Sequence, residues 1–229
     1  MKLLAIGAHP DDIEIFMYGL LAICKNRGDD VYAAIATDGS KGGTPPGKRL
    51  AEIRALETKN ALKGMCEPYF FNFIDGELSF SKNAEIEIKN YIEKINPDLI
   101  VTHAPNDYHS DHRCVSYLIK NISGFNTPII FADTLMGIDF IPDYFFDITK
   151  YFEAKKSAIL KHISQTPHKF LDAAFIMNSY RAAQCNAPKG CFYEGYKLYR
   201  NFPFNDVRSL LPEAPKMRPF NKGFKNSLI

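Results

Sequence analysis

The chain has 229 residues, of which 46% are hydrophobic and 24% are charged. This composition argues against a disordered chain, and the length suits one large α/β domain. The 28 basic and 26 acidic residues nearly balance, so nothing points to nucleic acid as the main partner. Five scattered cysteines without a CxxC pair support neither a disulfide framework nor a cysteine zinc site, and they fit a reduced cytoplasmic setting. No apolar stretch is long enough to span a membrane.

The first forty residues follow the pattern of a βαβ unit. Residues 2–7 predict a buried parallel strand, because every residue after Lys2 in this segment is apolar. Residues 13–27 carry apolar side chains at helical spacing and predict a helix, and residues 31–37 predict a second strand. Between the first strand and the helix stands the sequence His-Pro-Asp-Asp, residues 9–12. In an open α/β sheet, that position is the carboxyl end of a strand, where ligands bind.

A glycine-rich loop, residues 38–47, follows the second strand. Its backbone N–H groups could cradle a phosphate, but it matches no P-loop or dinucleotide pattern, so a mobile lid or a plain connector remains an alternative. Residues 48–63 predict a helix with apolar positions at Leu50, Ile53, Ala55, Leu56 and Leu62. On this helix Arg54 and Glu57 are three residues apart, which taken alone indicates a solvated ion pair.

The rest of the chain continues the alternation and then loosens. Residues 69–73 predict a third strand, and residues 82–95 a helix with its isoleucines at 86, 88, 92 and 95 facing inward. A fourth strand opens at Asp98. Further predicted elements are a helix over 110–122 with Ser110 as its N-cap, a strand over 128–132, a short strand within 142–149, and helices over 150–163 and 169–186. No repeat, linker or domain boundary is visible, and the basic segment 214–229 is expected to be a loosely held tail or a contact with a neighbouring subunit.

A second polar group follows the fourth strand. Here His109 and His112 repeat the three-residue spacing of His9 and Asp12. If both strand ends meet in one crevice, His9, Asp12 and His112 offer zinc three ligands and an open fourth position, as catalytic zinc sites do. The same ligand set also suits iron(II). Each group taken alone has an ordinary explanation as polar loop residues or helix caps, and only the pair favours a metal.

The segments Ala-His-Pro-Asp-Asp-x-Glu at 8–14 and His-x-Asp-His at 109–112 resemble the two signatures of the PIG-L/LmbE-like zinc de-N-acetylases. Weaker similarity extends over roughly residues 3–196. The resemblance implies a single-domain, Rossmann-like α/β fold, a three-layer sandwich with a mainly parallel sheet, and removal of acetyl groups from N-acetylglucosaminyl compounds. It also implies that Arg54 faces the substrate.

The chemistry assigns a role to each remaining candidate. Asp11, turned away from the metal, is placed to take a proton from water and pass it to the leaving amine, and His109 to stabilise the oxyanion. The resemblance implies the same two roles. Asp111 is expected to bind the other ring nitrogen of His109 and to fix its tautomer. His103, His162 and His168 are expected to be structural, although His162 falls in a segment that is similar to the family and is a further candidate for the pocket. Glu14 is expected to face the pocket rim or to cap the helix.

We therefore expect a cytoplasmic, zinc-dependent N-deacetylase acting on a small amino sugar conjugate, with no nucleic-acid or membrane partner. Analogy with the family favours a homo-oligomer. The alternatives are a zinc amidohydrolase or esterase with a non-sugar acyl substrate, and a non-enzymatic nucleotide-binding domain that uses loop 38–47. The sequence does not identify the aglycone.

Overall fold

The structure is a computed structural model that describes residues 1–81 and 83–220, so residue 82 and the end of the tail, 221–229, lie outside it. Seven strands form one sheet in the order β3-β2-β1-β4-β5-β7-β6. They are β1 (Lys2–Gly7), β2 (Asp30–Thr37), β3 (Pro68–Phe73), β4 (Leu99–Thr102), β5 (Ile129–Ala132), β6 (Tyr144–Asp147) and β7 (Tyr193–Leu198). The first five run parallel, and β7 pairs antiparallel with both β5 and β6. The predicted single-domain, mainly parallel α/β fold is confirmed.

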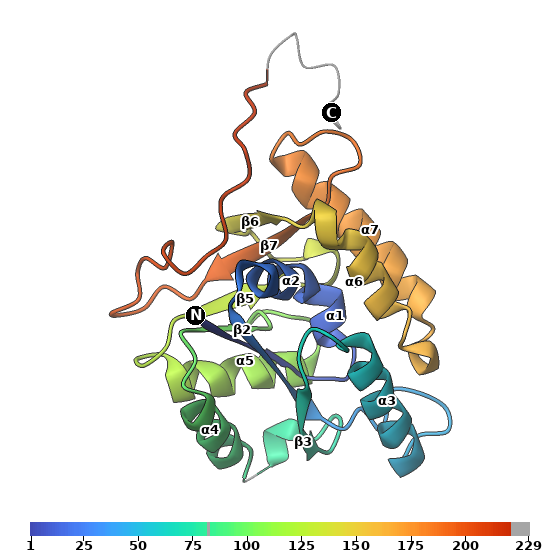
Figure 1. Ribbon diagram of the computed structural model, residues 1–229. Coiled ribbons are helices and arrows are strands. Elements are labelled where there is room, and N and C mark those ends of the chain that lie inside the picture. Colours follow the sequence, from blue (N-terminus) through green and yellow to red (C-terminus); the bar gives the residue numbers. More distant parts are fainter. Residues whose placement is uncertain (82, 221–229) are drawn as a thin grey trace.

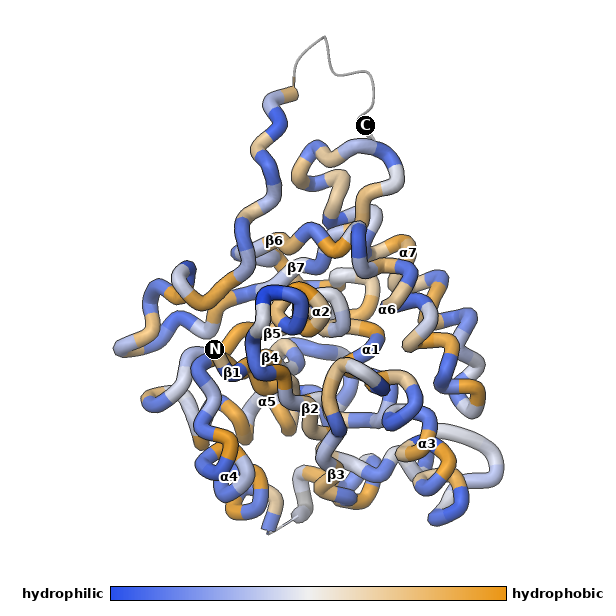
Figure 2. Tube along the Cα trace, viewed as in Figure 1, coloured by the Kyte–Doolittle hydropathy of each residue, from blue (hydrophilic) through white to orange (hydrophobic). Residues whose placement is uncertain are grey.

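Helices cover both faces of this sheet (Figure 1). The helices are α1 (Asp12–Phe16), α2 (Tyr18–Arg27), α3 (Lys48–Ala61), α4 (Ala84–Ile95), α5 (Ser110–Ser123), α6 (Phe152–Ile159) and α7 (Pro167–Gln184), with short 3-10 turns at η1 (Leu78–Phe80), η2 (Leu135–Gly137), η3 (Thr149–Tyr151) and η4 (Ile163–Gln165). One apolar cluster joins α1, α2, α6 and α7 to one face of the sheet, and a second joins α4 and α5 to the other. Figure 2 shows the hydrophobic residues gathered along the central strands.

The topology places a crevice beside β1. The chain moves from β1 outward to β2 and β3, then returns to the other side of β1 to form β4 and β5. At such a switch point the loops after neighbouring strands diverge and leave room for a ligand. Residues 8–12 and 103–109 therefore leave the sheet side by side, as the two sequence signatures required.

The first predicted helix, 13–27, is in fact two helices. The break falls at Met17, whose φ of −130° is not helical. The cause comes from the far end of the chain, because the carboxylate of Glu194 on β7 accepts the backbone N–H groups of Gly19 (2.9 Å) and Leu20 (2.8 Å). These are amides of the first turn of α2, which have no partner within the helix. Lys155 neutralises the same buried carboxylate at 2.7 Å.

Ile86 on α4, which was predicted to face inward, is 60% exposed, so that assignment was wrong. Ile53 and Leu56, two of the apolar positions on α3, are also exposed, at 41% and 59%. Each helix packs along one narrow stripe, and on α3 that stripe carries Arg54 and Thr58 together with Leu50. A buried guanidinium on a helix face cannot be distinguished from a solvated one by apolar periodicity.

The C-terminal third departs furthest from expectation. Residues 193–198, which were not assigned to the sheet, form β7 between β5 and β6. The helix expected over 150–163 ends at Ile159 and continues as isolated turns. The segment expected as a tail starts at 214, and within its described part Arg218 donates to the hydroxyl of Tyr193 at 3.1 Å. In the portion of the chain that the structure covers, no helix has the length and apolar character needed to cross a membrane.

Candidate metal centre and active site

Three side chains meet at the carboxyl ends of β1 and β4. Nδ1 of His9 lies 3.2 Å from Nε2 of His112. Nδ1 of His9 is 3.3 Å from Oδ2 of Asp12, and Nε2 of His112 is 3.3 Å from Oδ1 of the same carboxylate. Ligands held at about 2.0–2.1 Å around a tetrahedral zinc ion are about 3.3–3.4 Å apart. The three residues therefore fit a metal ion in ligand type and in spacing.

The predicted ligands are held by neighbours that the sequence reasoning missed. Oδ1 of Asp107 lies 3.1 Å from Nδ1 of His112, which directs the other nitrogen, Nε2, into the centre. Oδ2 of Asp12 accepts the backbone N–H of His9 at 2.6 Å and lies 3.1 Å from His103, so Oδ1 is the oxygen that faces His112. Carboxylate and backbone partners of this kind usually accompany metal-binding histidines.

His103 lies behind this centre. Its Nε2 accepts the backbone N–H of Ala8 at 3.0 Å, and its ring stacks on that of His112 with 3.7 Å between centroids. A nitrogen that accepts an amide proton has its lone pair in use, so His103 supports the ligands from behind. Its atoms also lie close enough to Asp12 and His112 to form a possible metal-binding group with them.

Asp11 projects away from the ligand triangle, as predicted from its place next to Asp12. Its φ of 128° is in a region that side chains other than glycine rarely adopt. Such strain persists where the surrounding structure enforces it, commonly at functional sites. The carboxylate is buried and pairs with Arg54 at 3.2 Å. Burial raises the pKa of Asp11 to about 6, against the lowering effect of the Arg54 charge.

His109 lines the same cavity as Asp11, and its contacts correct two predictions. It is His109, and not Ser110, that caps α5, because its Nδ1 accepts the backbone N–H of Asp111 at 3.2 Å. That bond leaves the ring proton on Nε2. The carboxylate of Asp111 was expected to fix this tautomer, but it faces Nε2 of His9 at 3.4 Å instead. Burial and the charge of His9 lower the pKa of His109, which favours a neutral hydrogen-bond donor.

The charges of the three candidate ligands and their neighbours shift one another's pKa values strongly. Burial lowers the pKa of His112, but Asp12 and Asp107 outweigh it and raise the pKa to about 9. For His9, the carboxylates of Asp111, Asp12 and Asp75 likewise overcome burial and hold its pKa well above the usual value. Burial raises the pKa of Asp12, yet the neighbouring histidines bring it well below its usual range. Without a cation, protons on the two ligand histidines balance the carboxylates.

A cavity of about 360 Å³ opens above these residues. Its wall includes the three ligands, Asp11, His109, Arg54 and the glycine-rich loop at Lys41 and Gly42. The aromatic side chains on its edge, which the sequence could not identify, are Phe16, Tyr108 and Phe170. The volume suits a small substrate such as a sugar ring with its acyl group.

Arg54 lines the cavity, on the side of the molecule where the resemblance led us to expect it, and not in an ion pair with Glu57. Its guanidinium is 3% exposed and donates to the carbonyls of Pro10 (2.7 Å) and Gly39 (3.0 Å), while Glu57 accepts bonds from Ser164. A Cβ added at Gly42 would lie 2.2 Å from Nη1 of Arg54. The loop therefore needs glycine where it crosses this guanidinium, because a side chain there would collide with Arg54.

Two further histidines lie apart from His9 and His112. His162 is buried with its Nε2 3.1 Å from Oε1 of Glu14, and His168 is exposed on α7. Glu14 is fully buried, so it neither faces the rim nor caps the helix by a side-chain bond. All five cysteines are free, in agreement with the absence of a disulfide framework.

Comparison with known proteins agrees with this geometry. Residues 4–123, which contain both signatures and the whole ligand triangle, match the family model PIG-L, described as GlcNAc-PI de-N-acetylase. The chain belongs to the PIG-L family. Diacetylchitobiose deacetylase from Thermococcus kodakarensis is 30% identical over 188 residues, which span 72% of this chain and 70% of that protein. The family assignment thus rests on the segment that carries the site and on a relative that extends beyond it.

Two solved structures share the fold. N,N′-diacetylchitobiose deacetylase from Pyrococcus horikoshii, complexed with an inhibitor, superposes with a TM-score of 0.73 at 25% identity, covering 89% of this chain and 87% of its own. GalB, the 4-carboxy-2-hydroxymuconate hydratase from Pseudomonas putida, gives a TM-score of 0.76 at 17% identity, covering 90% and 99%. At that identity the hydratase shows the shared fold alone, so the reaction must be argued from the site.

Proposed function

We propose that this PIG-L-family protein is a metal-dependent N-deacetylase whose substrate is an N-acetylglucosaminyl-type amino sugar conjugate. The single observation that carries the proposal is the triangle of His9, Asp12 and His112 at the floor of a cavity. Family membership and the 30% identical diacetylchitobiose deacetylase support the acetamido sugar as substrate. Zinc is the favoured metal, and iron(II) suits the same ligand types.

The residues around the cavity divide the work of amide hydrolysis. His9, Asp12 and His112 would hold a divalent cation, which when bound would polarise the acyl carbonyl and lower the pKa of water. Asp11, whose pKa of about 6 makes it ionised at neutral pH, accepts a proton from the attacking water and returns one to the leaving amine. The Nε2–H of His109 donates to the carbonyl oxygen as that oxygen gains negative charge. The products are acetate and the free amino sugar.

Arg54 has a double role in this proposal. Its guanidinium holds Asp11 in the ionised form and also lines the cavity, where it can contact the sugar. The exposed ring of Tyr108 offers an apolar surface on which a sugar ring can stack. We further propose that the whole chain, 1–229, acts as one catalytic domain in the cytoplasm, as a homo-oligomer without nucleic-acid or membrane partners.

Acetate release from a panel of substrates tests the proposal. The panel contains N,N′-diacetylchitobiose, N-acetylglucosamine and its phosphorylated and aryl conjugates, together with non-sugar N-acetyl amines and acetyl esters. We expect turnover of one or more sugar amides and its loss with a chelator. Turnover confined to the non-sugar amides or esters would favour the zinc amidohydrolase or esterase alternative. Absence of any turnover, with stabilisation by a nucleotide, would instead support a binding domain.

A further inference from the structure

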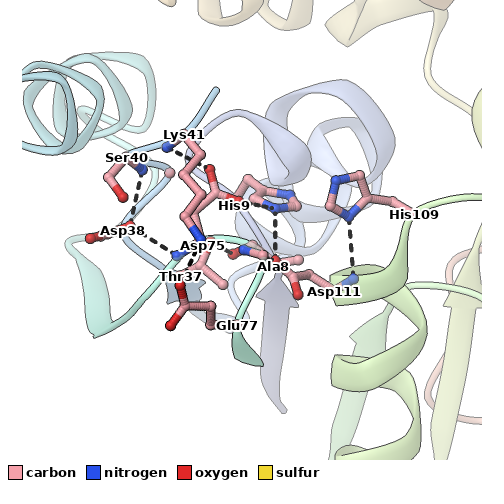
Figure 3. A network of polar contacts seen from close by, with 12 residues as sticks. Ala8, His9, Thr37, Asp38, Ser40, Lys41, Asp75, Glu77, His109 and Asp111 are labelled. Atoms are coloured by element: carbon pink, nitrogen blue, oxygen red, sulfur yellow. Dashed lines mark hydrogen bonds and ion pairs between the residues drawn. The ribbon is translucent and has the colours of Figure 1, made fainter. Parts of the chain in front are cut away.

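Asp75, on the turn after β3, was not singled out by the sequence and has no role in the mechanism above. Its carboxylate is buried and lies beside the ring of His9 (Figure 3). It faces Nε2 of that ring, whereas Asp12 faces Nδ1. Oδ1 of Asp75 lies 3.3 Å from Nε2 of His9, and Oδ2 of Asp111 lies 3.4 Å from the same nitrogen. The two carboxylates converge on one ring nitrogen from two separate segments of the chain.

Both carboxylates are fixed by backbone amides. Oδ2 of Asp75 accepts the backbone N–H of Lys41 at 3.0 Å, and Oδ2 of Asp111 accepts that of Gly76 at 2.7 Å. Asp38 adds a further bond, since its Oδ1 accepts the N–H of Asp75 at 3.2 Å. The turn after β3, the glycine-rich loop and the start of α5 are thereby joined around His9 (Figure 3). Neither carboxylate can rotate away from His9 without losing its hydrogen bond from a backbone N–H group.

The ring of His9 uses its two nitrogens differently. Nδ1 points at His112 and Asp12, where a lone pair is needed to bind a metal. A neutral imidazole has one lone-pair nitrogen and one N–H. We propose that Asp75, together with Asp111, is a positioning residue that holds the proton of His9 on Nε2 and so presents Nδ1 to the metal. This inference rests on the proposed metal centre and assigns a function to the turn after β3.

The same three residues also have the spacing of a second cation site. The chemistry of His9 argues against that use. If Nδ1 binds one metal, the neutral ring keeps its proton on Nε2, and a protonated nitrogen cannot bind another. The carboxylates of Asp75 and Asp111 flank this N–H at 3.3 and 3.4 Å, which is longer than a hydrogen bond, so they act on the proton through their charge.

The test is the zinc affinity of Asp75→Asn, measured on the full chain by competition with a chromophoric chelator. Loss of such a partner commonly weakens metal binding by about 10–100-fold, and we expect that range. Glu77→Gln is the matched control, because Glu77 is half-exposed, lies two residues away and pairs with Nζ of Lys41 at 2.8 Å without contacting His9. Its zinc affinity should equal that of the unmodified protein. Proton–nitrogen NMR of the His9 ring should show the Nε2–H form in the unmodified zinc-loaded protein.

If Asp75→Asn does not fold, Asp111→Asn removes the other carboxylate from the same nitrogen and should also weaken zinc binding at least tenfold. Zinc affinity within twofold of the unmodified protein in either folded variant would overturn the inference. Binding of two zinc ions, one of them lost in Asp75→Asn, would overturn it in favour of a second cation site. If the unmodified protein binds neither zinc nor iron(II), both the proposed function and this inference fail. Unchanged zinc affinity in the variants refutes the positioning role alone.

Discussion

Nδ1 of His9 and Nε2 of His112 lie 3.2 Å apart although 103 residues separate them in the chain. Two imidazole nitrogens at this distance, both aimed at the same carboxylate, make a costly arrangement without a proton or a cation between them. The separation also matches the edge of a tetrahedral zinc site. The fold therefore brings the two strand-end signatures together in the geometry that a metal requires.

Asp11→Asn tests the assignment of the proton-transfer residue. The amide keeps the size of the side chain but cannot accept a proton at neutral pH, so turnover should fall by about 10²–10⁴-fold. Zinc stoichiometry and the circular dichroism spectrum should be retained, because Asp11 faces away from the ligands. Full activity in this variant, measured by acetate release, would show that another group accepts the proton.

The dependence of turnover on pH follows from the same residue. Asp11 acts in its ionised form, and its pKa of about 6 predicts an acid limb near pH 6, or lower when a cation is bound nearby. Arg54→Ala removes the charge that lowers this pKa, so the acid limb should move to higher pH. Arg54→Lys keeps the charge and should leave the limb closer to its original position. An acid limb at the same pH in all three proteins would show that Arg54 does not affect the pKa of Asp11.

Zinc affinity should rise with pH. His112 has a pKa raised to about 9 and the pKa of His9 is also raised, so a metal must displace protons from both below that range. Each displaced proton weakens binding about tenfold for every pH unit below the pKa. Titrations with zinc at pH 6, 7 and 8 should therefore give steadily smaller dissociation constants. A dissociation constant independent of pH would contradict the protonated, metal-free state.

The metal-free protein should lose stability as the pH rises above 6.5. Burial lowers the pKa of His162, but Glu14 outweighs it and raises the folded-state value above 6.5. A group with a raised pKa contributes stability that is fully present below its unfolded value and is lost as the pH passes its folded value. His9 and His112 act in the same direction. The free energy of unfolding, measured with denaturant and chelator at pH 6.5 and pH 9, should decrease less in His162→Asn than in the unmodified protein. An equal decrease in both proteins would show that His162 does not contribute.

Much of the fold and the convergence of His9 with His112 was predictable because the information is local. Residues 3–7 are apolar without interruption, and His9 and Asp12 follow closely, so a strand end and its polar cluster could be assigned from one short segment. The second cluster before α5 has the same form. Strand ends of a parallel sheet meet at one edge, which allowed the convergence of His9 with His112 to be expected.

The remainder depends on contacts between distant segments. Glu194, which binds Gly19 from 175 residues away in the chain, breaks the first helix. No sequence pattern around Met17 predicts this break. The burial of Arg54 depends on the glycine-rich loop that folds over it. Asp75 also stands at a strand end, so the rule that identified His9 could have marked it. Its partner was unknown, and an Asp-Gly pair after a strand usually indicates only a turn.

The most direct test of the metal centre is stepwise return of zinc to chelator-treated protein, with acetate release from N,N′-diacetylchitobiose measured at each step. The account predicts that activity is absent without metal, rises in proportion to added zinc and stops rising at one equivalent per chain. His112→Ala should recover none of it. Full activity in the metal-free protein, or equal recovery by His112→Ala, would contradict the shared cation on which the account depends.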